Sequence, residues 1–354
     1  MTHPSDDVPF SRRRWLQSSA ALGAAVVVPG CASGPAPRGP VPAPPRRRPD
    51  GPHDVLIVGG GPAGLSAALA LGRARKRVLL CDAGPPRNAA ASEVHNFLSR
   101  DGVPPAELRR VARAQLAAYP DVEIRDARVE SIEGERGAFR AVLADARVEA
   151  RRVLICTGMI DEMLPLEGFR EHWGHAVFQC PYCHGWEARD RPWGFLVLGD
   201  PGGHVLPFAL QLPAWTDEVT LFTGGEGGIP DEARGALDRA GVRVEERPIA
   251  RLVGDGRRLE AVELADGGRV ACEVLFAHPP QRQVELVRRL GLELDAHGFV
   301  VADPRTRETS TPGVYAAGDL TTRMQAAVAA AATGMQAGAV LNMDLMFERA
   351  GAAP

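Results

Sequence analysis

Two cysteines and a histidine stand close together in the stretch VFQCPYCHGWEARD, residues 177–190. The spacing of Cys180 and Cys183 is typical of thioredoxin-like redox pairs, and together with His184 it also matches the attachment sequence of c-type haem. A third chemistry fits the same residues, namely a disulfide that exchanges electrons with a bound flavin. The segments around the pair have to decide among the three.

The other cysteines do not extend this site. Six cysteines are present, and those outside the pair are scattered along the chain as Cys31, Cys81, Cys156 and Cys272. A disulfide-stapled framework and a four-cysteine zinc site would both need further close pairs, so the sequence predicts neither a framework nor a metal. The last three of these cysteines are expected to be inert thiols in the core.

The composition is that of an ordinary soluble protein. The 354 residues are 45% hydrophobic and 24% charged, and the net charge is −3. This length is enough for two domains with a large core. Nothing outside the first fifty residues forms a basic block, so nucleic acid is not an expected partner.

The N-terminal segment is predicted to lie outside the fold. Residues 1–31 carry three consecutive arginines and then a short apolar run, and they look like a twin-arginine export signal. This predicts export to the bacterial cell envelope or periplasm; a tail with chance arginines is the alternative. Cys31 ends a stretch that resembles a lipobox, which would supply a lipid anchor. Residues 32–52 are rich in proline and should form an extended linker.

A glycine-rich turn follows the linker. An apolar strand over residues 55–58 leads into Gly59-x-Gly61-x-x-Gly64, where a helix begins. Gly59 permits the tight turn, Gly61 lets the backbone approach a pyrophosphate, and Gly64 lets the helix pack on the strand. The first residues of the helix complete the predicted phosphate site, because a helix N-terminus attracts anions. These residues are Pro62 and Ala63.

The next strand strengthens the prediction of a dinucleotide fold. It covers residues 77–80 and ends at Asp82, about twenty residues after the glycines. An acid at this place can hydrogen-bond a ribose hydroxyl, and the alternative is a solvated acid in a turn. Strand, turn, helix, strand and acid in this order are typical of a Rossmann-like domain.

A motif near the C-terminus narrows the cofactor. A strand over residues 314–317 leads to Gly318-Asp319, and an alanine-rich helix is expected from about Gln325. This looks like the second FAD motif of flavoproteins that have two dinucleotide folds. The resemblance implies that Asp319 binds the ribityl chain and that the helix, beginning near Gln325 and Ala326, points at the isoalloxazine.

A third segment, RRVLICTGM, resembles the strand that precedes the domain crossover in such proteins. It covers residues 151–159 and adds Thr157 and Gly158 to the predicted cofactor site. The three motifs stand in the expected order along the chain. FAD is therefore the predicted cofactor.

Residues 53–349 as a whole resemble the low-molecular-weight thioredoxin reductases. The resemblance implies an α/β fold of two Rossmann-like, three-layer dinucleotide-binding domains, the second inserted into the first. Residues 53–163 and 281–350 would form the FAD-binding domain, and residues 164–280 the NAD(P)-binding-like domain. In that family the redox pair comes just before the first strand of the insert, and here Cys183 precedes a predicted strand over residues 193–199.

One branch of the family resembles this chain more closely. RNAAASEVHNFLSRDG, residues 87–102, and CHGWE after the pair are similar to the dithiol oxidases that close disulfides in natural products such as gliotoxin and holomycin. The resemblance implies that Cys183 attacks the flavin C4a position and that Cys180 exchanges with the substrate. His184 replaces the aspartate of ordinary reductases and, with an unperturbed pKa near neutrality, is suited to shuttle the proton. A packing role is the alternative.

The rival chemistries of the pair weaken in this context. A c-type haem would need a second axial ligand and attachment to an unfolded exported chain, whereas the twin-arginine route exports folded proteins. A glutaredoxin-like domain would need a small fold of its own around the pair, and no such unit is visible.

The loop after Asp82 contributes further candidates. Arg87 and Asn88 could contact the adenosine half of the cofactor or the substrate mouth, while His95 and Asn96 lie in a segment that in this family approaches the flavin.

The second glycine-rich turn departs from the family pattern. In LVLGDPGGHVLPFALQL, residues 196–212, Gly199 holds the first glycine place, Pro201 the second and His204 the third. Proline lacks an N–H and adds bulk where a pyrophosphate needs bare backbone. Residues 218–228, after the next strand, supply no arginine for a 2′-phosphate. NADPH binding is therefore expected to be lost, with an unusual nicotinamide site as the alternative.

The sequence thus predicts an exported FAD enzyme that oxidises a small dithiol or a thiol protein without NADPH. An NAD(P)H-dependent thioredoxin-disulfide reductase is the first alternative, and a non-catalytic flavoprotein of the envelope is the second. Members of the family are commonly homodimers, but the sequence shows no interface signature.

Overall fold

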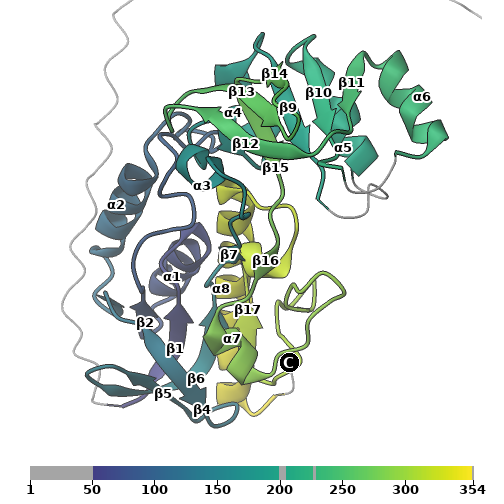
Figure 1. Ribbon diagram of the computed structural model, residues 1–354. Helices are drawn as coiled ribbons and strands as arrows, with labels where there is room; N and C mark the ends of the chain where they lie inside the picture. Colours follow the sequence, from purple (N-terminus) through teal and green to yellow (C-terminus); the bar gives the residue numbers. More distant parts are fainter. Residues whose placement is uncertain (1–50, 199–204, 226–228, 353–354) are drawn as a thin grey trace, which may run out of the picture. The chain divides into compact units, whose positions relative to one another are not determined.

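The computed structural model describes residues 51–198, 205–225 and 229–352 (Figure 1). Several predicted features lie outside the described residues: the export signal 1–31 with Cys31, nearly all of the linker, and the turn positions Gly199, Pro201 and His204. Within the described ranges, no helix is both long enough and apolar enough to cross a membrane.

The first sheet has seven strands in the order β3-β2-β1-β6-β5-β4, with β17 also paired to β6. The strands are β1 (His53–Val58), β2 (Val78–Cys81), β3 (Val122–Arg125), β4 (Val129–Glu133), β5 (Phe139–Leu143), β6 (Arg147–Ile155) and β17 (Val314–Ala316). β6 is long enough for two partners on one side, because its first half pairs antiparallel with β5 and its last three residues pair parallel with β17. Segments from both ends of the chain therefore share one sheet.

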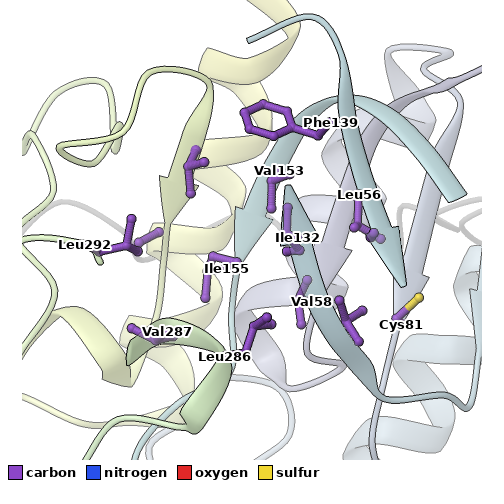
Figure 2. Close-up of a cluster of buried hydrophobic side chains, with 14 of the residues drawn as sticks. Leu56, Val58, Cys81, Ile132, Phe139, Val153, Ile155, Leu286, Val287 and Leu292 are labelled. Carbon is purple, nitrogen blue, oxygen red and sulfur yellow. The ribbon is translucent and has the colours of Figure 1, made fainter. Parts of the chain in front are cut away.

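Both faces of this sheet are covered, as its strands of continuous apolar residues require. Val55 and Ile57 of β1 pack toward α1 and α8, which lie against each other. Leu56 and Val58 point the opposite way, into a cluster with β4, β5 and α7 (Figure 2). Side chains alternate along a strand, so the two faces of β1 belong to two separate clusters: one with the helices α1 and α8, and one with β4, β5 and α7. The helices of this part are α1 (Pro62–Arg73), α2 (Pro105–Leu116), α7 (Glu285–Leu290), the 3₁₀ helix η2 (Asp319–Thr321) and α8 (Ala327–Ala350).

The second sheet is parallel throughout, in the order β11-β10-β9-β15-β8. Its strands are β8 (Val177–Phe178), β9 (Trp193–Leu196), β10 (Val219–Phe222), β11 (Val242–Glu245) and β15 (Val274–Ala277). A three-stranded antiparallel sheet shares its core: β12 (Ile249–Gly254), β13 (Leu259–Leu264) and β14 (Arg269–Ala271). The helical elements are α3 (Phe169–His172), α4 (Pro181–Ala188), α5 (Val205–Gln211), the 3₁₀ helix η1 (Leu212–Ala214) and α6 (Asp231–Arg239).

Two short strands pair where the chain passes between the sheets. β7 (Ile160–Asp161) and β16 (Gln281–Arg282) form an antiparallel ribbon. They lie beside the predicted domain boundaries at 163/164 and 280/281. The exact positions of these boundaries stay predictions.

The predicted α/β fold with two Rossmann-like parts is confirmed, with local corrections. The redox pair does not precede the first strand of the second sheet, because β8 comes before it in the chain. β9 ends at Leu196, three residues earlier than the predicted strand. The C-terminal helix begins at Ala327, so Gln325 precedes it and Ala326 is its N-cap.

Candidate active site

Cys180 and Cys183 are joined by a disulfide at the start of α4, with their Cα atoms 5.3 Å apart. Cys180 is the N-cap of the helix, Pro181 follows in its first turn, and the N–H of Cys183 donates to the carbonyl of Cys180 at 3.1 Å. Both cysteines are half-buried, so the bridge is neither sealed in the core nor fully open. Such a disulfide can be reached by an attacking thiolate.

His184 follows in the same turn and lies flat against Phe178, with 4.1 Å between ring centroids. Both of its ring nitrogens are buried and have no hydrogen-bond partner among the described residues. Burial, with a smaller effect of nearby His95, lowers the pKa of His184 to about 4. His184 is therefore neutral at pH 7 while the disulfide is formed, and its role as a proton shuttle stays a prediction. A thiolate formed beside it would raise that pKa again, because an opposite charge stabilises the imidazolium.

The loop after β2, which carries His95 and Asn96, contacts the disulfide helix α4; its predicted approach to the flavin stays a prediction. The Asn96 side chain donates to the backbone carbonyl of Tyr182. His95 lies 3.5 Å from Glu187 of the same helix and also contacts Glu93 at 3.2 Å. These contacts place the two predicted residues beside the redox pair.

Arg87 is the centre of a polar cluster. Its Nε and Nη2 atoms donate to both carboxylate oxygens of Asp161, at 2.7 and 3.0 Å. Its Nη1 atom donates to Asp319 at 3.3 Å and to Gln325 at 2.6 Å, and Nη2 also donates to Gln179, the neighbour of Cys180. The predicted place at the adenosine half does not fit this geometry, because Arg87 lies with the Asp319 motif.

The other candidate of this loop, Asn88, is exposed and only its carbonyl is used, by the N–H of Ala91 at 3.1 Å. Asp319 belongs to the cluster around Arg87, with which it forms an ion pair at 3.3 Å. Burial raises the pKa of Asp319, and the guanidinium of Arg87 opposes that rise.

The glycine turn of the first sheet has the predicted geometry. Gly59 has a φ of 111°, and a Cβ there would lie 2.3 Å from the carbonyl oxygen of Cys156. A Cβ on Gly64 would lie 1.9 Å from the carbonyl oxygen of Gly59, so the helix can approach the strand only with glycine. Gly61 faces open space and is the N-cap of α1 without a side-chain cap. The helix N-terminus, with Pro62 and Ala63 in its first turn, is free to meet an anion.

Asp82 lies at the carboxyl end of β2 and is 8% exposed, which rules out a solvated turn acid. It accepts a hydrogen bond from the N–H of Gly60 at 3.2 Å and forms an ion pair with Arg109. A pocket of about 240 Å³ opens beside it, lined by Asp82, Ala83, Gly84, Arg109, Asp126, Ala127 and Arg128. The pocket lies where a dinucleotide of a Rossmann-like fold places its ribose.

Two further predicted residues follow β6. The hydroxyl of Thr157 is buried without a partner among the described residues, and Gly158, with a φ of 64°, faces open space. Gly318 follows β17 with a φ of 93°, and its N–H donates a hydrogen bond to the hydroxyl oxygen of Thr333 in α8 at 3.1 Å. Polar groups and free space therefore lie at the carboxyl ends of β6 and β17, which are neighbours in the sheet.

The second sheet is built differently at the corresponding positions. The N–H of Val197 donates to the carbonyl of Phe222 at 2.9 Å, as the N–H of Gly59 donates to that of Cys81 at 2.8 Å. Val197 therefore holds the same ladder position in the second sheet as Gly59 in the first, while Gly199, the predicted first glycine, lies outside the described residues. After β10 comes Thr223, whose hydroxyl is buried without a partner among the described residues.

Sequence reasoning missed several residues of the site. Arg109 of α2 reaches Asp82, and Asp161 and Gln281 of the connecting strands join the cluster around Arg87, with 2.7 Å between Gln281 Nε2 and Asp161 Oδ1. Asp161 and Gln281 could have been found from the sequence, because each is a polar residue where the chain passes from one domain to the other. Nothing local distinguishes Arg109 from the other arginines of its helix.

Residues 53–334 match the family model described as pyridine nucleotide-disulphide oxidoreductase. The chain belongs to this family. Its enzymes act on sulfur groups, and membership implies a flavin cofactor, with a nicotinamide nucleotide as a further ligand in many members.

Relatives and solved structures agree with this family. The thioredoxin reductase tcpT of Claviceps purpurea is 33% identical over 83% of this chain and 95% of its own length. A thioredoxin reductase of Mycolicibacterium smegmatis is 30% identical over 76% of this chain and 88% of its own. Among solved structures, HlmI is 38% identical with a TM-score of 0.78, covering 85% of this chain and 94% of its own. An oxidoreductase from Agrobacterium tumefaciens is 37% identical with the same TM-score, covering 84% and 99%.

The residues of the first sheet fit the flavin that the family implies. The uncapped N-terminus of α1 and the open space at Gly61 suit a phosphate group, and the buried hydroxyl of Thr157 needs a polar partner. Asp82 and Asp319 supply acceptors at the ends of two different strands. When bound, a flavin would accept two electrons from the reduced cysteine pair.

Proposed function

We propose that the protein is an FAD-dependent dithiol oxidase that works through the Cys180–Cys183 disulfide without NADPH. The observation that carries this proposal is the disulfide at the N-terminus of α4, flanked by His184 and held against the loop of His95 and Asn96. The similarity of the surrounding sequence to the dithiol oxidase branch supports the same conclusion.

The proposed reaction transfers two electrons in two exchanges. A substrate thiolate attacks Cys180, which breaks the protein disulfide and leaves Cys183 as a thiolate. The second substrate thiol then attacks the mixed disulfide, releasing the substrate disulfide and a reduced pair. A bound FAD would accept two electrons from the reduced pair, so that Cys180 and Cys183 form the protein disulfide again. Dioxygen, or another two-electron acceptor, takes the electrons and two protons, and with dioxygen the product is hydrogen peroxide.

His184 would hold the proton during exchange. It is neutral in the oxidised protein, so it can accept a proton when Cys183 becomes a thiolate. The imidazolium and the thiolate would stabilise each other in the buried surroundings of the pair. The proton is released when the pair is reoxidised. In this proposal His184 is protonated only while the cysteine pair is reduced.

FAD would be held by the residues that the sequence indicated. The pyrophosphate would lie on the N-terminus of α1 at Gly61, the adenosine ribose near Asp82, and the ribityl chain near Asp319. Arg87 would hold Asp319 and Gln325 in place and, through Gln179, keep the start of α4 near them.

Independence from NADPH is supported by the end of β10. The strand is followed by Thr223, Gly224 and Gly225, and none of these can pair with a 2′-phosphate. The proline at position 201 supports the same proposal from the sequence. Export to the cell envelope, proposed from residues 1–31, fits an enzyme that does not draw on cytoplasmic NADPH; a lipid anchor at Cys31 belongs to the same proposal.

A homodimer through α8 is a further part of the proposal. Between residues 328 and 346 the exposed positions of this helix recur every three or four residues, so they form one stripe, and each is apolar: Val328, Ala332, Met335, Ala339, Met343 and Met346. The opposite side of the helix packs on α1. An exposed stripe of apolar side chains can mark a protein–protein interface, and a second copy of the chain could cover it. We expect Met335→Glu to yield monomers in sedimentation velocity.

The alternative is an NAD(P)H-dependent thioredoxin-disulfide reductase, which the names of several relatives favour, since they are called thioredoxin reductases. Anaerobic mixing separates the two. We expect dithiothreitol to bleach the flavin absorbance rapidly, and NADPH and NADH to bleach it at less than about one hundredth of that rate. Cys180→Ser and Cys183→Ser are the controls, and both should stop bleaching by dithiothreitol. Rapid bleaching by a nicotinamide would refute the oxidase, and no bleaching by any reagent would indicate a non-catalytic flavoprotein.

A further inference from the structure

Two aromatic side chains of α4 are unusually exposed. Tyr182 and Trp186 are 65% and 66% exposed. Every other tryptophan and tyrosine in the described ranges is buried or half-buried. Both exposed rings thus belong to the eight-residue helix that carries the redox disulfide. Exposing two large apolar rings to water is unfavourable, and two such rings side by side on one helix indicate a binding site.

The two rings border Cys183. Tyr182 and Trp186 are four residues apart and Cys183 and Trp186 three apart, and both spacings place side chains next to each other on a helix. The opposite side of α4 is fixed, because a Cβ on Gly185 would lie 3.0 Å from both Trp193 and Trp215. The helix therefore presents its aromatic side to solvent and cannot roll to bury it.

The rings are also held individually. Tyr182 meets Trp215 edge-on, with 5.2 Å between ring centroids. The guanidinium of Arg189 lies 4.1 Å from the ring centroid of Trp186. Ordered rings lose little conformational freedom when a ligand binds, which favours their use in recognition.

A third apolar side chain comes from the loop that touches α4. Leu98 is 90% exposed and lies two residues after Asn96, whose side chain donates to the carbonyl of Tyr182. The contact between His95 and Glu187 ties the same loop to the helix at a second point. Leu98 thus belongs to the loop that contacts α4 at two points, and its side chain is open to solvent.

We propose that Leu98, Tyr182 and Trp186 form a substrate-docking surface for the apolar, ring-bearing body of a small dithiol. At the observed exposures the three side chains offer roughly 400 Å² of surface. This is about half of the area that each partner contributes to a standard protein–protein interface, so the surface suits a small molecule better than a folded thiol protein. The substrate body would lie on the rings while its sulfur atoms exchange with Cys180. The inference rests on the proposed dithiol oxidation.

Two small dithiols, which differ in whether an aromatic ring links their thiol groups, test the surface. 1,2-Benzenedimethanethiol carries an aromatic ring and dithiothreitol does not. We expect Trp186→Ala and Tyr182→Ala each to lower kcat/KM for the aromatic dithiol about tenfold, mainly through KM, and to change that for dithiothreitol less than about twofold. Leu294→Ala, which alters a 41% exposed leucine far along the chain, is the matched control and should change neither. An equal loss with both dithiols would overturn the proposal.

A second measurement does not depend on turnover. The bis-S-methyl ether of the aromatic dithiol cannot exchange, so its binding to the oxidised enzyme, measured by calorimetry, reports on the surface alone. We expect Trp186→Ala to weaken this binding about tenfold. Unchanged binding would refute the surface even if dithiols are oxidised. Binding that depends on Trp186, in an enzyme that oxidises no dithiol, would keep the surface and refute the proposed function. Reduced thioredoxin is the protein probe, and a loss seen only with it would assign the surface to a protein and overturn the proposal.

Discussion

The first and second sheets share a ladder pattern but place different side chains at equivalent points. In the first sheet the N–H of Asp82 donates to the carbonyl of Arg125 at 2.9 Å, and in the second the N–H of Thr223 donates to that of Glu245 at 3.0 Å. A buried acid with a cation partner thus corresponds to a buried hydroxyl. The comparison teaches that two sheets can share a backbone hydrogen-bonding pattern while different side chains stand at the end of the second strand. The first sheet has an acid there that could bind a ribose, and the second has a hydroxyl.

The turn after the first strand differs in the same sense. Gly59 lies so close to β6 that no side chain fits, whereas Val197 at the equivalent point is a buried part of the core. The first sheet therefore has no room for a side chain at this position, whereas the second sheet holds one there that packs in the core. The predictions below test this difference, from the largest expected effect to the smallest.

The largest effect is expected for Gly59→Val. The new side chain would meet the backbone carbonyl of Cys156 at 2.3 Å and would strain a residue with a φ of 111°, so the turn cannot keep its shape. We expect a loss of about 3 kcal/mol or more in the free energy of unfolding and almost no flavin after purification. Urea unfolding and the ratio of flavin to protein absorbance measure both. Val197→Ala should keep its flavin, and a Gly59→Val protein with full flavin content would contradict the comparison.

Asp82→Asn should weaken flavin binding without unfolding the protein. The carboxylate accepts from Gly60 and pairs with Arg109, and an amide loses the charge but keeps the shape. We expect the Kd for FAD, measured by reconstitution of the apoprotein, to rise about tenfold to hundredfold. An unchanged Kd would show that Asp82 is only a structural partner of Arg109.

His184→Phe should change how stability depends on pH. The pKa of His184 is about 4 in the folded protein and about 6.5 when unfolded, so the unfolded chain binds more protons between these values. Wild-type stability therefore falls as the pH drops from about 6.5 to about 4, and phenylalanine, which keeps the stack on Phe178, removes this contribution.

Urea unfolding at about pH 7 and about pH 4.5 measures the difference. We expect His184→Phe to gain stability relative to the wild type on acidification. The exposed His297, changed to glutamine, is the control and should follow the wild type. A constant difference at both pH values would mean that His184 is not buried as a neutral ring.

The smallest effect is expected for Thr223→Val. Its hydroxyl is buried without a partner among the described residues, so a methyl group of similar size should be tolerated or should add about 1 kcal/mol of stability. Flavin content and the rate of bleaching by dithiothreitol should not change. A loss of flavin or of activity would show that the second sheet has a ligand role at this point.

Much of the fold and part of the site follow from local sequence patterns. The glycine turn at residues 59–64, the acid after the second strand and the apolar strands could be read in order, because turn geometry and strand patterning depend on neighbouring residues. The short strand β8 before the pair could not be anticipated, since its two residues gain their place only by pairing with β15.

The sequence by itself determined that two dinucleotide-type folds exist, that a cysteine pair with a following histidine stands in the second, and that the second turn lacks the second and third of the usual glycines. The tertiary structure decided which groups meet: Arg109 with Asp82, Arg87 with Asp319, and the loop of Asn96 with α4. It also decided that His184 is neutral. Ion pairs between distant segments and the pKa of a buried ring depend on packing and burial, which no local pattern specifies.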